Sequence, residues 1–209
     1  MYIPSSFAET NLSNLHDAMQ AYSFATLISQ AEGTLTASHL PLLLDRGAGE
    51  WGTLIGHMAR ANPQWKQAAE GEVLAIFSGP HAYISPTWYA DSRTVPTWNY
   101  VAVHAYGKLE LVENPEEMLW IVQQMVETYE ANLPRPWSLE EPAEFVNSLL
   151  AGIIGFRIRL TRLEGKWKLN QNHPPDRRRR TITALAGQND ENSQAISRLM
   201  AAALLPDAP

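Results

Sequence analysis

The stretch VLAIFSGPHAYISPTWYADSRTVPTWNYVAVHAY, residues 73–106, carries the strongest structural signal in the chain. Two runs within it, ISPTWY at 84–89 and VPTWNY at 95–100, each gather proline, threonine, tryptophan and tyrosine. Proline fixes φ and removes a backbone donor, so each run includes a stiff segment outside regular hydrogen bonding. The aromatic rings that follow suit either a planar ligand that stacks on them or a subunit contact.

Apolar and β-branched segments separated by turn residues predict a set of strands at the ends of this stretch and beyond them. The expected strands are 24–28, 34–44, 51–57, 72–78, 101–111 and 156–161. Glu32-Gly33 predicts a hairpin turn, and Gly79-Pro80-His81 predicts a second turn. The last strand alternates apolar and polar side chains, which is typical of a sheet with one exposed face.

Capping residues and apolar spacing predict several helices. The expected helices are 12–19 after Thr10 or Asn11, a short one opened by Asn62-Pro63, one opened by Asn114-Pro115, one from Ser138 with Glu141 toward Leu150, and one after Asn189. Many strands, then helices, then a returning strand indicate a mainly β (α+β) fold with peripheral helices. We expect a barrel domain over 1–188 with a helical insertion around 114–150, and a C-terminal helix and tail over 189–209.

The composition limits the function classes. The 209 residues include no cysteine, which excludes disulfides and thiolate metal sites and fits a cytoplasmic protein. The first residues lack a basic segment followed by an apolar run, so we expect no signal peptide. No stretch has the roughly 20 apolar residues of a membrane span, and we expect no membrane partner. The formal charge of −6 argues against a protein that coats DNA through its whole surface.

Short motifs along the chain resemble those of the PaiB family, FMN-binding split-barrel proteins described as negative transcriptional regulators. The matching segments are MYIP at 1–4 through Phe7, ASHLP at 37–41, GHMARANPQW at 56–65, the two proline-rich runs, and KLNQN at 168–172. The resemblance extends from Met1 to about Leu185. It implies an FMN-binding split β-barrel of about six strands that forms a homodimer with the flavin at the subunit seam.

The resemblance also implies which residues hold the FMN. They are Ser38, His39, His57, Arg60, Asn62, Thr97, Trp98, Asn99, Lys168 and Gln171. Arg60 and the helix start at Pro63 would receive the phosphate, because a helix N-terminus offers free N–H groups. Asn99 would face the alternating edge of the flavin ring, and Trp98 would stack on that ring or pack under it. Strand alternation places Ser38 and His39 on opposite faces.

Four consecutive arginines, Arg177, Arg178, Arg179 and Arg180, are the strongest signal for DNA contact. They could neutralise phosphates, although such a run is more often a solvated face. No helix-turn-helix pattern lies beside them.

Other chemistries have no support in the sequence. The six histidines form no H-x-x-x-H or H-E-x-x-H pattern, so we expect no metal site. No G-x-G-x-x-G opens a βαβ unit. The expected function is an FMN-binding regulatory protein that represses transcription. A flavin-dependent oxidoreductase or a haem-handling enzyme on the same fold is the alternative, and catalytic residues stay unassigned because a fold does not determine chemistry.

Overall fold

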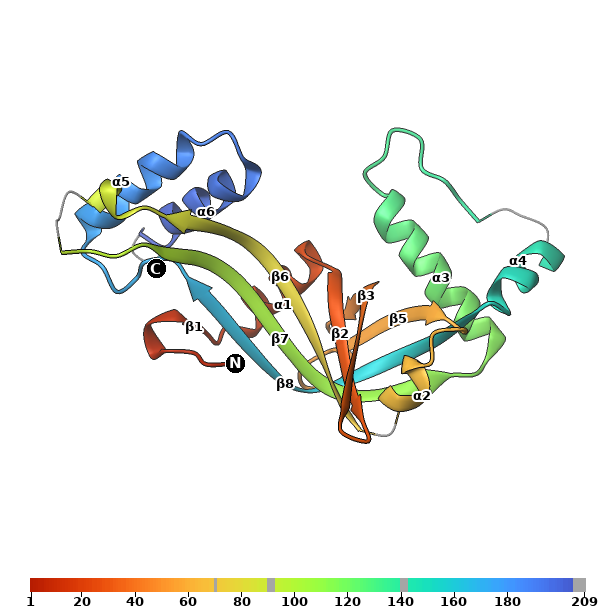
Figure 1. Ribbon diagram of the computed structural model, residues 1–209. Helices are drawn as coiled ribbons and strands as arrows, with labels where there is room; N and C mark the ends of the chain where they lie inside the picture. The colour runs from red at the N-terminus through yellow and green to blue at the C-terminus, as the bar shows by residue number, and fades with distance from the viewer. Residues whose placement is uncertain (70, 90–92, 140–142, 205–209) are drawn as a thin grey trace. The chain divides into compact units, whose positions relative to one another are not determined.

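The computed structural model describes residues 1–69, 71–89, 93–139 and 143–204 (Figure 1). These residues contain eight strands in one sheet with the order β3-β2-β6-β7-β8-β5-β4, and β1 pairs with β8. The strands are β1 Ala8–Glu9, β2 Phe24–Ala31, β3 Thr34–Pro41, β4 Leu43–Asp45, β5 Thr53–Ala59, β6 Glu72–Ile84, β7 Thr97–Val112 and β8 Ile153–Lys168. The pairs β1–β8, β2–β3, β2–β6, β4–β5 and β5–β8 are antiparallel, which confirms the mainly β prediction.

Six α-helices accompany the sheet in the described residues. They are α1 Leu12–Ala21, α2 Gln64–Ala68, α3 Pro115–Glu130, α4 Ala143–Leu150, α5 Pro175–Ala186 and α6 Glu191–Ala202. Two predicted caps are confirmed, because the Asn11 side chain accepts from Ser13 N–H and that of Asn114 from Glu116 N–H. Glu141, half of the predicted capping pair near α4, lies outside the described residues.

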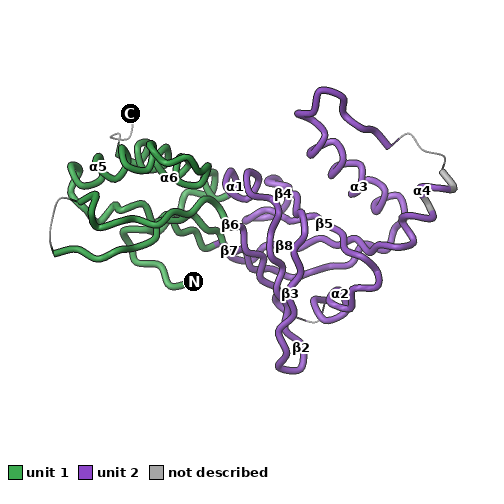
Figure 2. Tube along the Cα trace, turned by 45° about the horizontal axis from the view of Figure 1, so that its top comes forward, with its two compact units in different colours: residues 1–15, 78–103, 164–209 green, residues 16–77, 104–163 purple. Residues whose placement is uncertain are grey.

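The chain divides into two compact units (Figure 2). Unit 1 comprises residues 1–15, 78–103 and 164–209, and unit 2 comprises 16–77 and 104–163. Strands β6, β7 and β8 therefore contribute one part to each unit. The division of the chain at residue 188 stays a prediction.

The core of unit 2 lies between α3 and the sheet. Ile55, Val112, Ile121 and Met125 form one buried cluster there, with Leu43 packed against it. Gly155 allows the helix to approach β8, because a Cβ at that position would lie 2.6 Å from the Met118 sulfur. The β2–β3 hairpin turns at Glu32 and Gly33 as predicted, with φ of 49° and 78°. Two successive positive φ values are typical of the tight turns that match strand twist.

The core of unit 1 lies where α5 and α6 pack on the ends of the long strands. The buried side chains of this cluster are Ala82, Ile84, Tyr89, Leu169, Leu185, Ile196 and Met200. Trp88 and Trp167 pack against the cluster and are themselves half-buried. Trp88 and Tyr89 therefore pack within unit 1.

The structure differs from the sequence analysis in three local features. Gly79-Pro80-His81 is not a turn but lies inside β6, where Pro80 is buried. Helix α5, which Pro175 opens, was not among the expected helices. The sheet has eight strands, more than the six expected, since β1 and β4 are short segments that lack a clear alternating pattern.

Candidate functional site

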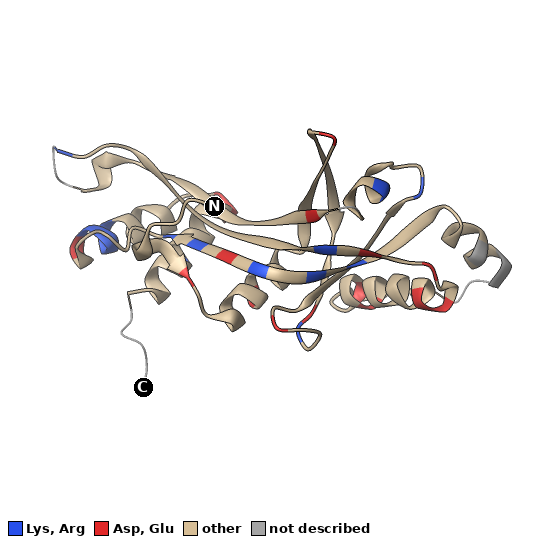
Figure 3. Ribbon diagram, turned by 90° about the horizontal axis from the view of Figure 1, so that it is seen from below, with Lys and Arg blue, Asp and Glu red and all other residues tan. Residues whose placement is uncertain are grey.

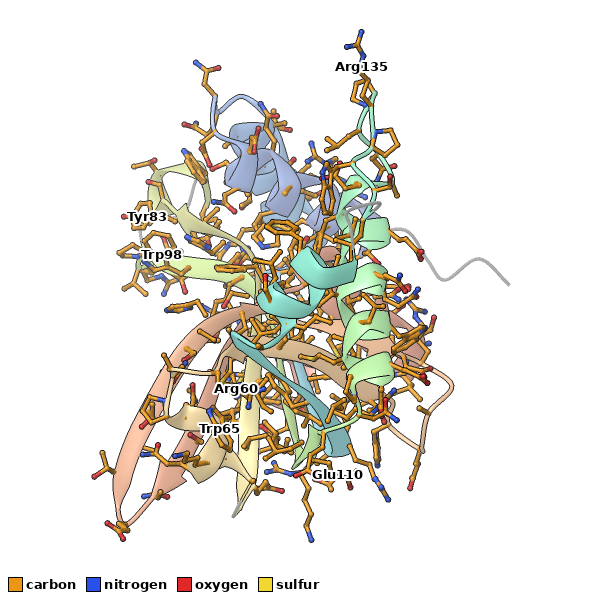
Figure 4. All side chains as sticks on the ribbon, turned by 90° about the vertical axis from the view of Figure 1, so that its right-hand side faces the viewer. Arg60, Trp65, Tyr83, Trp98, Glu110 and Arg135 are labelled. Atoms are coloured by element: carbon orange, nitrogen blue, oxygen red, sulfur yellow. The ribbon has the colours of Figure 1, made fainter. Side chains whose placement is uncertain are left out.

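In unit 1 the structure brings together three of the predicted flavin residues. Lys168, the last residue of β8, donates from its ammonium group to the Thr97 hydroxyl and, at 2.7 Å, to the Trp98 carbonyl oxygen. The Trp98 side chain is 54% exposed. Its ring contacts Tyr83 at 5.9 Å edge-on and His81 at 6.1 Å between ring centroids. Figure 4 shows Tyr83 and Trp98 side by side on neighbouring strands.

Positive charge gathers beside this group. Lys166 is 7% exposed, donates to the Tyr2 carbonyl oxygen at 3.0 Å, and lies 5.2 Å from the centre of the Tyr100 ring. In the described part of the chain neither Lys166 nor Lys168 forms an ion pair with a carboxylate. Burial, and then the charge of Lys166, lower the pKa of Lys168. Two lysines without a counterion are a suitable environment for an anion such as a phosphate.

The other two predicted residues of unit 1 have internal roles. Asn99 is fully buried, and its amide donates to the Met200 sulfur at 3.4 Å. Its Oδ1 has no hydrogen-bond partner among the described residues. Gln171 accepts from Leu169 N–H at 2.7 Å and donates to the Trp167 carbonyl oxygen, so it closes the turn after β8. That turn places Asn170 at φ 62°.

In unit 2 a second predicted pair comes together. The Asn62 amide donates to the Ser38 hydroxyl at 2.9 Å, and its Oδ1 accepts from Gln64 N–H at 3.0 Å. Asn62 thus links β3 to the start of α2. His39 lies on the other side of the strand, exposed, where its Nδ1 pairs with the Thr26 hydroxyl at 3.1 Å. The predicted alternation of Ser38 and His39 is consistent with these contacts.

Arg60 and His57 lie near the end of β5, in different surroundings. Arg60 donates from Nε to the Ala151 carbonyl oxygen at 2.9 Å. The Nδ1 of His57 is buried and has no partner among the described residues, and burial lowers the His57 pKa. Helix α2 begins at Gln64, one residue later than expected, and has only five residues. Asn62 already occupies its first free N–H, so the phosphate role of this helix start stays a prediction.

The arginine run lies in the first turns of α5, and three of its side chains contact other residues of unit 1. Arg177 lies over the Tyr89 ring at 4.9 Å, Arg178 donates to the Ala203 carbonyl oxygen, and Arg180 donates to that of Tyr89. Arg179 pairs with Asp176 at 2.9 Å, and its side chain is 66% exposed. Figure 3 shows basic and acidic positions together at the start of this helix. Arg179 and Arg180 are the exposed residues of the run, and of these two Arg180 donates to the Tyr89 carbonyl oxygen.

The residues of unit 1 fit the chemical groups of FMN. A phosphate requires cations, which Lys166 and Lys168 supply, and a flavin ring requires a flat apolar surface, which the exposed Trp98 supplies. Sequence reasoning missed Lys166 together with Tyr2 and Tyr100. Lysines at alternate positions of a strand lie on one face, so the spacing of Lys166 and Lys168 could have indicated that both contribute to the site.

Other site types find no support in the described residues. These residues contain no group of three His, Asp or Glu side chains that could hold a metal ion. None of their helices combines the length and apolar character needed to cross a membrane.

Comparisons with known proteins support a flavin cofactor. Residues 1–162 match the family model described as "Putative FMN-binding domain". The chain is 37% identical over 204 residues to the protease synthase and sporulation protein PAI 2 of Bacillus subtilis, covering 96% of both chains.

Two solved structures share the fold at low sequence identity. The flavocytochrome Anf3 from Azotobacter vinelandii matches with a TM-score of 0.58 and 13% identity, covering 90% of this chain and 75% of that one. The FAD and heme binding protein from Mycobacterium smegmatis matches with a TM-score of 0.56 and 16% identity, covering 87% and 80%. These likenesses identify the fold as a split barrel of the kind found in flavin-binding proteins. The family match and the Bacillus subtilis relative show that the chain belongs to the PaiB family of FMN-binding proteins.

Proposed function

We propose that this protein binds FMN non-covalently as a homodimer and acts as a negative transcriptional regulator. The observation that carries the FMN part is the group of Lys168, Thr97 and Trp98. Lys168 lies 71 residues after Thr97 and 70 after Trp98 in the sequence, yet it donates hydrogen bonds to both. This group combines a cation without an acidic partner and an exposed aromatic ring. A phosphorylated, planar ligand needs both.

Each part of FMN has a complementary set of side chains. The ammonium groups of Lys166 and Lys168 would hold the phosphate, and binding would offset the unfavourable burial of the Lys168 charge. The Trp98 ring would lie against the flavin ring. FMN supplies redox chemistry when bound, and the protein side chains orient it and limit its contact with water.

The regulatory part rests on family membership. The name of the Bacillus subtilis relative connects that protein with protease synthesis and sporulation, and a regulator fits such a connection. We propose that a dimer presents one α5 from each subunit to DNA and that Arg179 makes a phosphate contact. Arg177, Arg178 and Arg180 would support the helix, because they already contact residues of their own unit.

The FMN proposal is tested with the absorbance spectrum of freshly purified protein, followed by titration with FMN. Bands near ~370 and ~450 nm, or saturable quenching of flavin fluorescence, would support it. A colourless protein that leaves FMN fluorescence unchanged would contradict it. A haem spectrum in place of a flavin spectrum would favour the haem-handling alternative.

The regulatory proposal needs a separate test. Protein with and without FMN is mixed with DNA from upstream of its own gene, and binding is measured as a function of salt. Saturable binding that weakens in an Arg179→Gln variant, with a smaller salt dependence, would support DNA contact through α5. Binding by neither form, together with FMN-dependent consumption of a reduced nicotinamide cofactor, would favour the oxidoreductase alternative. Ultracentrifugation over a range of protein concentrations tests the homodimer.

A further inference from the structure

Unit 2 contains a pocket of about 590 Å³ beside the first turn of α3. Its lining is mostly apolar and includes one cation and one carboxylate: Arg60, Trp65, Leu111, Val112, Glu113, Pro115, Met118, Leu150, Ala151, Ile153 and Ile154. Of the residues predicted to bind FMN, only Arg60 lines it. Figure 4 shows Arg60, which follows β5, close to Trp65 of α2.

The Arg60 side chain is held in place at the pocket. Its Nε donates to the Ala151 carbonyl oxygen at 2.9 Å, and its backbone N–H donates to that of Gly152, also at 2.9 Å. Its own carbonyl oxygen accepts from the Trp65 indole N–H at 3.1 Å. Arg60 forms no ion pair within the described ranges. A guanidinium fixed through Nε keeps its two terminal nitrogens available for a planar, bidentate partner.

The interior of the pocket is suited to a hydrocarbon or aromatic tail. Val112, Met118 and Ile154 are each 6% exposed and belong to the core, and Leu150 and Ile153 complete an apolar wall. Pockets with a mostly apolar lining and one convergent charge are typical of small-molecule sites.

We propose that this pocket is a second ligand site, separate from the flavin site, that binds an amphipathic carboxylate. The carboxylate pairs with the terminal nitrogens of Arg60, and the apolar tail lies between Trp65, Met118 and Ile154. Glu113 disfavours small anions that carry no tail, because such anions gain no apolar burial against its repulsion. The tail contributes to affinity in proportion to its buried length, at roughly fourfold for each added methylene.

The test is calorimetric titration of the full-length protein with three probes of equal chain length: decanoate, decan-1-ol and decylammonium. Decanoate should bind saturably, at least tenfold more tightly than decan-1-ol, and more tightly than octanoate. An Arg60→Gln variant should lose at least tenfold in decanoate affinity and retain its weak affinity for decan-1-ol. Arg135→Gln removes the same charge from an exposed position outside the pocket lining, as Figure 4 shows, and should bind decanoate like the original protein.

Other results would overturn the proposal. Equal affinity for decanoate and decan-1-ol, or an unchanged affinity in Arg60→Gln, would show that Arg60 recognises no carboxylate there. A preference for decylammonium that Glu113→Gln abolishes would assign the pocket to cations instead. Competition between decanoate and FMN would assign Arg60 to the flavin phosphate, as the resemblance implies, and remove the second site. Failure of FMN binding alone would leave the decanoate results unaffected, so the two proposals fail independently.

Discussion

The Lys168 ammonium nitrogen lies 2.7 Å from the Trp98 carbonyl oxygen, and this contact joins the end of β8 to the start of β7. The same nitrogen donates to the Thr97 hydroxyl. The contact bonds a cation that has no acidic partner among the described residues to the backbone of Trp98, whose ring is exposed. On the proposed function, Lys168 is already held by these two bonds before FMN binds, which would reduce the entropy lost on binding.

Trp98 should contribute to FMN binding through its ring. We expect Trp98→Ala to weaken FMN binding by about tenfold, because stacking of a flat ring is worth about 1–3 kcal/mol. Trp98→Phe should retain most of the affinity. Flavin fluorescence titration of the three proteins measures the effect. Equal affinities for the original protein and Trp98→Ala would exclude the ring from the site, and Trp137→Phe, at another exposed tryptophan, is the control.

Gln64 should stabilise unit 2 through a buried amide. It is fully buried, and its Nε2 lies 3.0 Å from the Leu27 carbonyl oxygen and 3.1 Å from that of Thr36. Gln64→Leu leaves both acceptors without this donor, so we expect a loss of about 2–4 kcal/mol in the free energy of unfolding. Urea denaturation provides the measurement. The exposed Lys66→Gln on the same helix should change stability by less than about 0.5 kcal/mol.

His57 should make stability fall at acidic pH. Burial lowers its pKa, so below about pH 6.5 the unfolded chain takes up a proton that the folded chain does not. The unfolding free energy should decrease with falling pH, by at most about 1.4 kcal/mol per unit from this group. Burial, then the charges of Arg177 and Lys168, also lower the pKa of His173.

The control for the pH effect is a His57→Asn variant, studied by urea denaturation at pH 7.5 and 5.5. The variant should lose less stability between these values than the original protein, and the remaining loss should include the His173 contribution. The same loss in both proteins would show that His57 is not the responsible group.

Asn114 should set the stability of α3. Its side chain accepts from Glu116 N–H at 2.8 Å, ahead of Pro115 at the first helical position. Asn114→Ala should lower the free energy of unfolding by about 1 kcal/mol. Asn114→Asp should keep the stability of the original protein, because an aspartate side chain can accept from the same backbone N–H groups as asparagine. Thermal denaturation of the three proteins gives the ranking, and an alanine variant as stable as the original would contradict it.

Local signals in the sequence predicted the regular elements well. The capping side chains of Asn11 and Asn114 marked α1 and α3, and Glu32-Gly33 marked the β2–β3 turn, because these signals act within four residues. Helix α5 was missed because Arg177 to Arg180 occupy its first turns and leave only Ile182 and Leu185 as large apolar residues. Gly79-Pro80-His81 resembles a turn in the sequence, because the sequence does not show that these residues lie within a long strand, β6.

The candidate site was harder to predict because it depends on contacts between distant segments. The resemblance supplied Thr97, Trp98 and Lys168, but only the fold shows that Lys168 bonds both of the others. The same fold buries Asn99 against Met200 and uses Gln171 to close a turn. Sequence gives residue types, whereas the strand register decides which side chains meet.

The central claim is that Lys168 helps to hold the FMN phosphate, and comparison of FMN with riboflavin, which lacks the phosphate, tests it most directly. The original protein should bind FMN at least tenfold more tightly than riboflavin, measured by quenching of flavin fluorescence at fixed salt. Lys168→Gln should lose most of this preference, while Lys108→Gln, at an exposed position of β7, should keep it. Equal binding of FMN and riboflavin by the original protein, or an unchanged preference in Lys168→Gln, would contradict the account.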